Sequence, residues 1–208
     1  MNKTNLQNLF KGFCKQNKLE INSQQIEIID LLDEFLSQKK NFLSKFFKRK
    51  KKLCFYLYGK VGVGKTMLLN FVFERLKIRK HRQHFNEFMI NFHNFRHEKK
   101  DNNTITAFVK ELKKKYDLIY LDEFQVTNIV DAMILGKLFE IIFEEKIKII
   151  ITTNTKLHDL YKDGLQRDQF LPFISIIENY SIQKELQIKD DYRTKNNEKL
   201  QQIFFPLN

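Results

Sequence analysis

The sequence has little cysteine and lacks any apolar run long enough to span a bilayer. Its two cysteines, Cys14 and Cys54, lie far apart, with the spacing of neither a disulfide framework nor a metal site. Residues 1–18 lack the apolar core of a secretory signal, and they hold Asn and Gln rather than the Ser and Arg of a mitochondrial transit peptide. These absences exclude a disulfide-stapled domain and favour a reducing compartment.

Composition indicates one domain, or one domain with a small appendage. Hydrophobic residues make up 42% of the 208 residues, and 21 residues are phenylalanine, which suffices for a core. The net charge is +12, and residues 48–52 form the densest basic run. This charge has two interpretations. One is a polyanionic partner, either nucleic acid or an anionic membrane surface. The other, which we favour, is the drift of an AT-rich genome toward Lys, Asn, Ile and Phe.

A glycine-rich segment follows the first apolar run. Residues 53–58 are typical of a strand, residues 59–66 read GKVGVGKT, and apolar residues then recur at helical spacing. This is the phosphate-loop pattern G-x-x-x-x-G-K-[ST] between a strand and a helix. Glycines let successive backbone N–H groups point at an anion, and the first helical turn adds free donors. Lys65 would contact the β- and γ-phosphates of ATP, and the Thr66 hydroxyl would bind Mg²⁺. The candidate nucleotide-binding residues are Gly59, Lys60, Val61, Gly62, Val63, Gly64, Lys65, Thr66 and Met67.

Two further apolar runs end in polar residues. Residues 118–121 precede Asp122 and Glu123, and residues 147–152 precede Thr153 and Asn154. A strand buried on both faces of a parallel sheet is apolar without alternation, and ligands bind at the carboxyl edge of such a sheet. Asp122 is therefore predicted to hold Mg²⁺, and Glu123 to orient and deprotonate the attacking water. Asn154 would contact the γ-phosphate. The alternative is that the acids merely end a strand in solvent, which their position after a phosphate loop disfavours.

Hydrophobic spacing predicts the other elements, with residues 1–20 irregular. Helices are expected at residues 26–36, 67–76, 89–95, 104–112, 126–145, 157–162 and 170–174, and strands at residues 53–58, 82–88, 117–122, 147–152 and 180–188. This alternation predicts an α/β fold with a central, mainly parallel sheet of five strands between layers of helices.

The histidines offer a competing metal site. His81 and His84 are three residues apart, and His93 and His97 are four apart, a spacing that can bind zinc on a helix. We favour the nucleotide site because no further ligand is spaced to complete a zinc site.

The order of these motifs resembles that of AAA+ ATPases. Their amino-acid sequences resemble those of the ZapE family, which includes the mitochondrial AFG-type relatives. The resemblance runs from Leu53 to Arg193. It is carried by the segments LYGKVGVGKTMLL, HFNEFM, LDEFQVTNIVDAMILGKLFE, ITTN, LYKDGLQRDQFLPFI and DDYR. It departs at Asn86 and Asn128, where the family usually has His and Asp. The family also continues with a helical region beyond the DDYR segment, whereas this sequence stops at residue 208, so a truncated or minimal member is implied.

The resemblance implies roles for particular residues. Lys65 and Thr66 would be the Walker A ligands, Asp122 and Glu123 the Walker B pair, and Asn154 sensor 1. Arg167 would be an arginine finger that acts on the nucleotide of a neighbouring subunit.

The resemblance also implies an Mg²⁺-dependent ATPase that works on a protein partner as a homo-oligomer. The partner would belong to the division machinery of a bacterial cytoplasm or to mitochondrial protein quality control. The alternatives are a non-hydrolysing nucleotide-binding switch and a DNA-associated loader ATPase. The expected organisation is an N-terminal helical segment with a basic linker (residues 1–50), an AAA+ core (residues 51–193) and a short tail (residues 194–208).

Overall fold

The computed structural model describes residues 3–37, 51–99 and 103–187. In that part of the chain, five strands form one sheet in the order β2-β3-β4-β1-β5, with every neighbouring pair parallel. The strands are β1 (Cys54–Tyr58), β2 (Lys80–His84), β3 (Leu118–Asp122), β4 (Lys148–Thr153) and β5 (Ser181–Glu185). The predicted parallel sheet of five strands is thereby confirmed.

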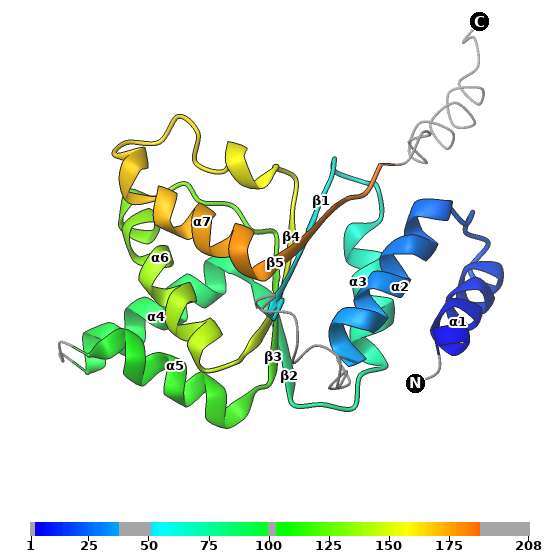
Figure 1. Cartoon of the computed structure of the whole chain (residues 1–208), viewed down its shortest axis with the longest axis horizontal. Helices are drawn as coiled ribbons and strands as arrows, with labels where there is room; N and C mark the ends of the chain where they lie inside the picture. The colour runs from blue at the N-terminus through cyan, green and yellow to red at the C-terminus, as the bar shows by residue number, and fades with distance from the viewer. Residues whose placement is uncertain (1–2, 38–50, 100–102, 188–208) are drawn as a thin grey trace, which may run out of the picture.

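Helices cover both faces of this sheet, in three layers (Figure 1). One face carries α1 (Lys3–Gln16), α2 (Ser23–Ser37) and α3 (Lys65–Glu74). The other carries α4 (Phe85–Glu98), α5 (Thr104–Lys115), α6 (Ile129–Glu144) and α7 (Leu171–Tyr180). Two short 3₁₀ turns, η2 (Leu157–Asp159) and η3 (Arg167–Gln169), lie between β4 and α7. In the described residues, no helix is long and apolar enough to cross a membrane.

The sheet separates two apolar clusters, because successive strand side chains point to opposite faces. Tyr56 and Ile119 belong to the cluster beneath α4 to α7. Phe55 and Tyr120, their chain neighbours, belong to the cluster beneath α1 to α3. All of β3 is buried, as its unbroken apolar run predicts.

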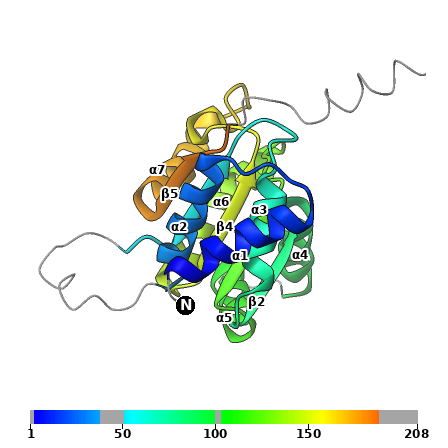
Figure 2. The ribbon, with the colours of Figure 1, turned by 90° about the vertical axis from the view of Figure 1, so that its right-hand side faces the viewer.

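The N-terminal residues form a helix, so the prediction that residues 1–20 are irregular is wrong. Leu6, Phe10 and Cys14 recur every four residues, and all three are buried in the same cluster as β1 and α3. The ring of Phe10 packs edge-on against Phe71 of α3, with 5.1 Å between the ring centroids. Figure 2 shows α1 and α2 side by side over this face. The burial of one apolar stripe therefore stabilises a helix whose other positions are mostly Asn, Gln and Lys.

Several predicted boundaries also shift. The strand expected at residues 82–88 is β2 and ends at His84, because α4 begins at Phe85 and buries Phe85, Phe88 and Met89 on one side. The helix expected from residue 126 begins at Ile129, after Asn128 caps it by accepting a hydrogen bond from the Val130 N–H. The helix expected at residues 157–162 is only the turn η2. The basic run at residues 48–52 is described only from residue 51, and the DDYR segment and predicted tail lie outside the described residues.

Candidate functional site

A cleft of about 620 Å³ opens at the carboxyl edge of the sheet. Strands β1, β3 and β4 are neighbours, so their carboxyl ends meet at this edge. The lining residues come from the phosphate loop with the first turn of α3, and from the carboxyl ends of β3 and β4 with the residues that follow them. They are Val61, Gly62, Gly64, Lys65, Thr66, Met67, Asp122, Glu123, Phe124, Gln125, Thr152, Thr153, Asn154 and Thr155. The structure thus brings together residues from three separate sequence motifs.

The path of the phosphate loop depends on glycine at both ends. Gly59 has a φ of 155°, and a Cβ there would lie 2.3 Å from the carbonyl oxygen of Leu186, just beyond β5. Gly64 has a φ of 88° and is the N-cap of α3, so the helix begins at Lys65 with its first N–H groups near the cleft. Of the predicted nucleotide-binding residues, Gly59, Lys60 and Val63 do not line the cleft.

The Lys65 ammonium lies at the centre of the loop. It donates to the carbonyl oxygens of Gly59 at 2.6 Å and Lys60 at 2.8 Å, and to the Asn154 side-chain oxygen at 2.9 Å. Burial lowers the pKa of Lys65, and the charge of Asp122 opposes that shift. One cation therefore links the loop after β1 to the polar tip of β4, which places the predicted Lys65 and Asn154 side by side.

Asp122 ends β3 with its side chain only 3% exposed. Its Oδ1 accepts hydrogen bonds from the Thr152 hydroxyl, from the Glu123 N–H at 3.1 Å and from the Thr66 hydroxyl at 3.4 Å. Its Oδ2 accepts from Arg82 at 2.6 Å. Burial by itself would raise the pKa of this carboxyl, but the bonds from Thr152 and Arg82 and the arginine charge hold it below its ordinary value.

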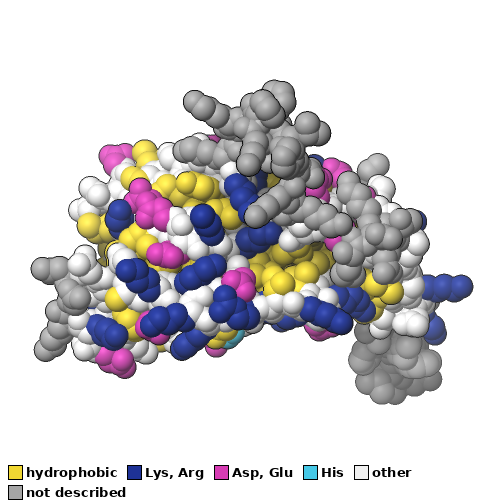
Figure 3. All heavy atoms as spheres, turned by 60° about the horizontal axis from the view of Figure 1, so that its bottom comes forward, with side chains coloured by type: hydrophobic (Ala, Val, Ile, Leu, Met, Phe, Trp, Pro, Cys, Tyr) yellow, Lys and Arg dark blue, Asp and Glu magenta, His cyan; other side chains and the backbone are white. Residues whose placement is uncertain are grey.

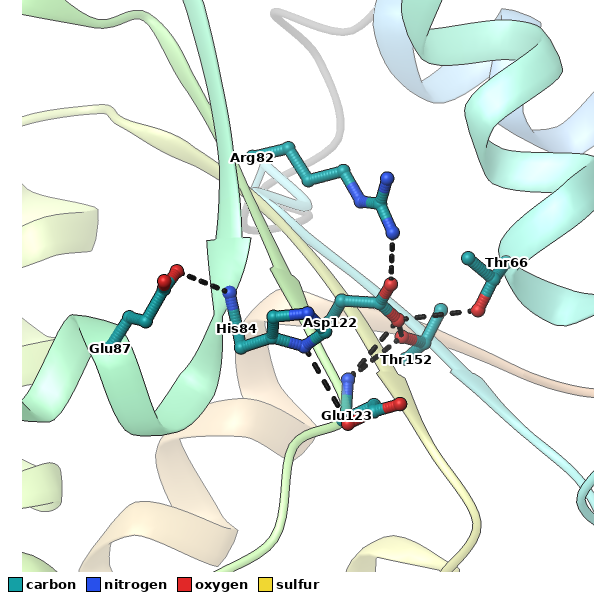
Figure 4. Close-up of polar contacts among 7 residues, drawn as sticks. All are labelled: Thr66, Arg82, His84, Glu87, Asp122, Glu123 and Thr152. Atoms are coloured by element: carbon teal, nitrogen blue, oxygen red, sulfur yellow. Dashed lines mark hydrogen bonds and ion pairs between the residues drawn. The ribbon is translucent and has the colours of Figure 1, made fainter.

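Glu123 adopts a left-handed backbone conformation, with a φ of 54°. Its N–H remains inside the site, where it also lies 3.3 Å from the Thr152 hydroxyl, whereas its side chain is 78% exposed at the cleft. The carboxylate lies 3.6 Å from Nδ1 of His84, the residue that precedes α4. Figure 4 shows this contact, together with the Glu87 carboxylate that accepts from the His84 N–H at 3.3 Å. A side chain in this position can reach water in the cleft.

Sequence reasoning missed Arg82 and His84. Both lie on β2, and their register partners on β3 are Tyr120 and Asp122. Strand alternation, Asp122 at the end of β3 and Glu123 after it were available as signals, but the adjacency of β2 and β3 was not.

Arg167 lies apart from the cleft. It begins η3, and its guanidinium donates to the carbonyl oxygens of His158 at 2.6 Å and Leu160 at 3.0 Å. It is not among the residues that line the cleft. Within the chain, Arg167 therefore fastens the segment around η2, and any contact with a nucleotide would be with that of another subunit.

The chemistry of the donor set fits Mg²⁺. The Thr66 hydroxyl and the Asp122 carboxylate are hard oxygen ligands, 3.4 Å apart, and Mg²⁺ in such sites takes its other ligands from phosphates and water. One histidine of each pair considered for zinc has another partner: His81 stacks on Tyr116 with centroids 4.8 Å apart, and His93 lies 2.7 Å from Asp131. Within the described ranges, no three His, Cys, Asp or Glu side chains are grouped as metal ligands.

The parallel sheet, the phosphate loop after β1 and the acidic pair at the end of β3 define a P-loop ATPase of the AAA+ class. The AMPPCP-bound DnaA of Aquifex aeolicus has a similar fold. It matches with a TM-score of 0.57 and 20% identity, over 92% of this chain and 56% of that one.

The chain belongs to the AFG1-like ATPase family, whose sequence model matches residues 15–208. It is 38% identical over 154 residues to Lactation elevated protein 1 homolog B of Danio rerio, which covers 68% of this chain and 31% of that protein. It is 34% identical over 142 residues to the cell division protein ZapE of Escherichia coli strain K12, which covers 67% and 38%. The resemblance to the ZapE and AFG-type family is confirmed. The chain spans about a third of the length of these curated relatives.

Proposed function

We propose that this chain binds ATP together with Mg²⁺ at the cleft and hydrolyses the bond to the terminal phosphate, which yields ADP and phosphate. One observation carries the proposal: Lys65, Thr66, Asp122, Glu123 and Asn154 come from distant parts of the sequence and line a single cleft. Further support comes from membership of the AFG1-like ATPase family and from the nucleotide analogue that the DnaA of similar fold binds.

Each side chain has a role that its position suits. The ammonium of Lys65 and the N–H groups of the loop would hold the phosphates, since both carry positive charge beside a helix N-terminus. Thr66 and Asp122 would hold Mg²⁺, which neutralises phosphate charge when bound. The exposed Glu123 carboxylate would accept a proton from the attacking water. Asn154, already beside Lys65, would orient the terminal phosphate.

Binding is tested with Lys65→Ala, which removes the phosphate-facing cation. The matched control is Lys137→Ala on α6, a lysine whose side chain is 61% exposed and paired with Glu140 at 2.7 Å. Calorimetric titration with a non-hydrolysable ATP analogue and Mg²⁺ should show binding that is weaker by about tenfold or more for Lys65→Ala. Lys137→Ala should bind as wild type does. Equal affinity of Lys65→Ala and wild type, with both folded by circular dichroism, would show that the cleft is not the phosphate site.

The partner and the assembly also belong to the proposal. We propose a homo-oligomer that acts on a protein partner, with Arg167 contacting the nucleotide of the adjacent subunit. The name of the E. coli relative, a cell division protein, supports a division partner, and we propose a bacterial cytoplasm as the location. A mitochondrial role in protein quality control is the alternative, supported by the AFG-type resemblance. We also propose that residues 51–193 form the AAA+ core. Size-exclusion chromatography with light scattering, with and without nucleotide, tests the assembly.

A nucleotide-binding switch that does not hydrolyse ATP is the second candidate. It is favoured by the contact between Arg82 and Asp122, because that contact occupies one oxygen of the metal-binding carboxylate. ATP turnover by the purified chain separates the two candidates. Release of phosphate that depends on Mg²⁺ and is lost in Glu123→Gln supports the enzyme, whereas stoichiometric binding without release supports the switch.

A DNA-associated loader is the third candidate, and only the positive charge favours it. Figure 3 shows Lys and Arg side chains scattered among acidic and apolar ones on the face at the bottom of Figure 1. Among the described residues, some of these cations are paired with acids: Arg79 with Asp117 at 2.7 Å, and Lys114 with Glu111 at 2.7 Å. Such pairing favours a solvated surface over a polyanion site. Salt-sensitive DNA binding would support a loader, and its absence at low salt would remove it.

A further inference from the structure

The two oxygens of the Asp122 carboxylate have different surroundings (Figure 4). Oδ1 faces Thr66 and also accepts from Thr152 and from the Glu123 N–H. Oδ2 faces away from these groups toward Arg82, whose Nη2 lies 2.6 Å away. The carboxylate is thus shared between the metal-binding hydroxyl of Thr66 on one side and a permanent cation on the other.

Arg82 is held in this position by the sheet. It is the register partner of Tyr120, two residues before Asp122 on β3, so strand alternation puts all three on one face. Its guanidinium carbon lies 5.3 Å from the centroid of the Tyr120 ring. The contact therefore follows from the β2–β3 register and does not depend on a long side chain reaching across solvent.

The distinctive contribution of Arg82 is charge. Oδ1 has three donors of its own, from Thr66, Thr152 and Glu123, so the carboxylate keeps its orientation without Arg82. None of those three donors is a cation, whereas Arg82 places a full positive charge on the same carboxylate. With the Lys65 ammonium also lining the cleft, two cations act on the buried Asp122 carboxylate when no phosphate is present, whereas the other acid of the lining, Glu123, has its side chain 78% exposed and screened by water.

We propose that Arg82 is the residue that sets the charge of the metal site. By neutralising Asp122, it prevents a divalent cation from binding until a nucleotide supplies phosphate oxygens, so metal and ATP bind as a pair. This inference rests on the proposed ATP site, whose ligands it uses, and it assigns Arg82 an electrostatic role, acting through Asp122, that the proposed function does not require. If Arg82 only joined β2 to β3, its removal would change stability and leave metal affinity unaltered.

The test measures metal binding to the full chain without nucleotide, with Mn²⁺ as the probe and the free ion quantified by electron paramagnetic resonance. Arg82→Gln removes the charge and keeps a hydrogen-bonding side chain, whereas Arg82→Lys keeps the charge. Arg79→Gln is the matched control. Arg79 precedes β2 and is bonded to Asp117 by two of its nitrogens, at 2.9 and 2.7 Å, but it does not line the cleft.

We expect Arg82→Gln to bind one Mn²⁺ with a dissociation constant at least about tenfold below that of wild type. Arg82→Lys and Arg79→Gln should behave as wild type does. Adding Asp122→Asn to Arg82→Gln should abolish the gained binding. Unchanged or weaker Mn²⁺ binding by folded Arg82→Gln overturns the proposal, and so does equal tightening in Arg82→Lys or Arg79→Gln.

The wild-type chain provides a second test that does not need a folded variant. A non-hydrolysable ATP analogue should tighten Mn²⁺ binding by about tenfold or more, because its phosphates supply the missing negative charge. Tight, saturable Mn²⁺ binding by the nucleotide-free wild type would overturn the proposal. If the analogue does not bind at all, the ATP site itself fails, and the nucleotide-free comparison of Arg82→Gln with wild type still decides the role of Arg82.

Discussion

Arg167, between β4 and α7, has two possible roles: it either stabilises its own segment or acts as an arginine finger on the next subunit. Its guanidinium donates hydrogen bonds to the backbone carbonyls of His158 and Leu160, and it does not line the cleft of its own subunit. Loss of two such bonds in Arg167→Ala should lower the free energy of unfolding by about 1–3 kcal/mol. If the role of Arg167 is purely structural, its replacement should have only this effect. An arginine finger acting on the next subunit is worth about 10³-fold or more in turnover.

We predict that Arg167→Ala keeps ATP binding and loses turnover by about 10³-fold, in addition to the stability change. Wild-type specific activity should rise with protein concentration as subunits associate. Mixing Arg167→Ala with Lys65→Ala should restore some activity, because each variant supplies the half-site that the other lacks. Lys162→Ala is the control: it removes a neighbouring cation that is 67% exposed and lies 3.9 Å from Asp159.

Steady-state phosphate release over a range of protein concentrations, with light scattering in parallel, is the assay. Normal hydrolysis by Arg167→Ala would refute the finger. So would a wild-type specific activity that is independent of concentration in a proven monomer. In either case the role of Arg167 would be only structural, through its hydrogen bonds to the carbonyl oxygens of His158 and Leu160.

Two further predictions concern stability. Burial, with a smaller effect from Lys51, lowers the pKa of Lys148 to about 8, so the unfolded chain binds more protons between pH 8 and the ordinary lysine value of 10.5. The free energy of unfolding should therefore rise with pH across this window, by at most about 3 kcal/mol, and Lys148→Met should lack that rise in denaturant titrations. Phe10→Ala should destabilise the chain by about 3–5 kcal/mol because Phe10 is fully buried, whereas Leu9→Ala should have little effect because Leu9 is 42% exposed. Equal effects of these two substitutions would mean that α1 does not belong to the core.

The sheet and much of the cleft were predictable from the sequence because their signals are local. The apolar run before Asp122 predicts a strand buried on both faces, and the glycine spacing before Lys65 predicts a loop that holds an anion. Parallel strands end at one edge, so these motifs and Asn154 had to meet there.

Other features depend on contacts that no local pattern encodes. Arg82 meets Asp122 only because β2 is the neighbour of β3, and strand order is a property of the whole sheet. The left-handed turn at Glu123 is an uncommon conformation for a non-glycine residue, and the sequence gives no sign of it. The α1 helix was not predicted because most residues around its apolar stripe are Asn, Gln and Lys. The spacing of four residues between Leu6, Phe10 and Cys14 was nevertheless a signal for it.

Hydrolysis of ATP at the cleft is tested most directly by comparing turnover by wild type and by Glu123→Gln, with binding of ATP and Mg²⁺ measured on the same samples. Glu123→Gln keeps the shape of the side chain but cannot accept a proton from water, and Glu144→Gln on the exposed side of α6 serves as control. We expect equal ATP affinity in all three proteins, with turnover lower by about 10²- to 10⁴-fold in Glu123→Gln alone. Turnover by Glu123→Gln at the wild-type rate, with ATP bound at the cleft, would contradict this expectation.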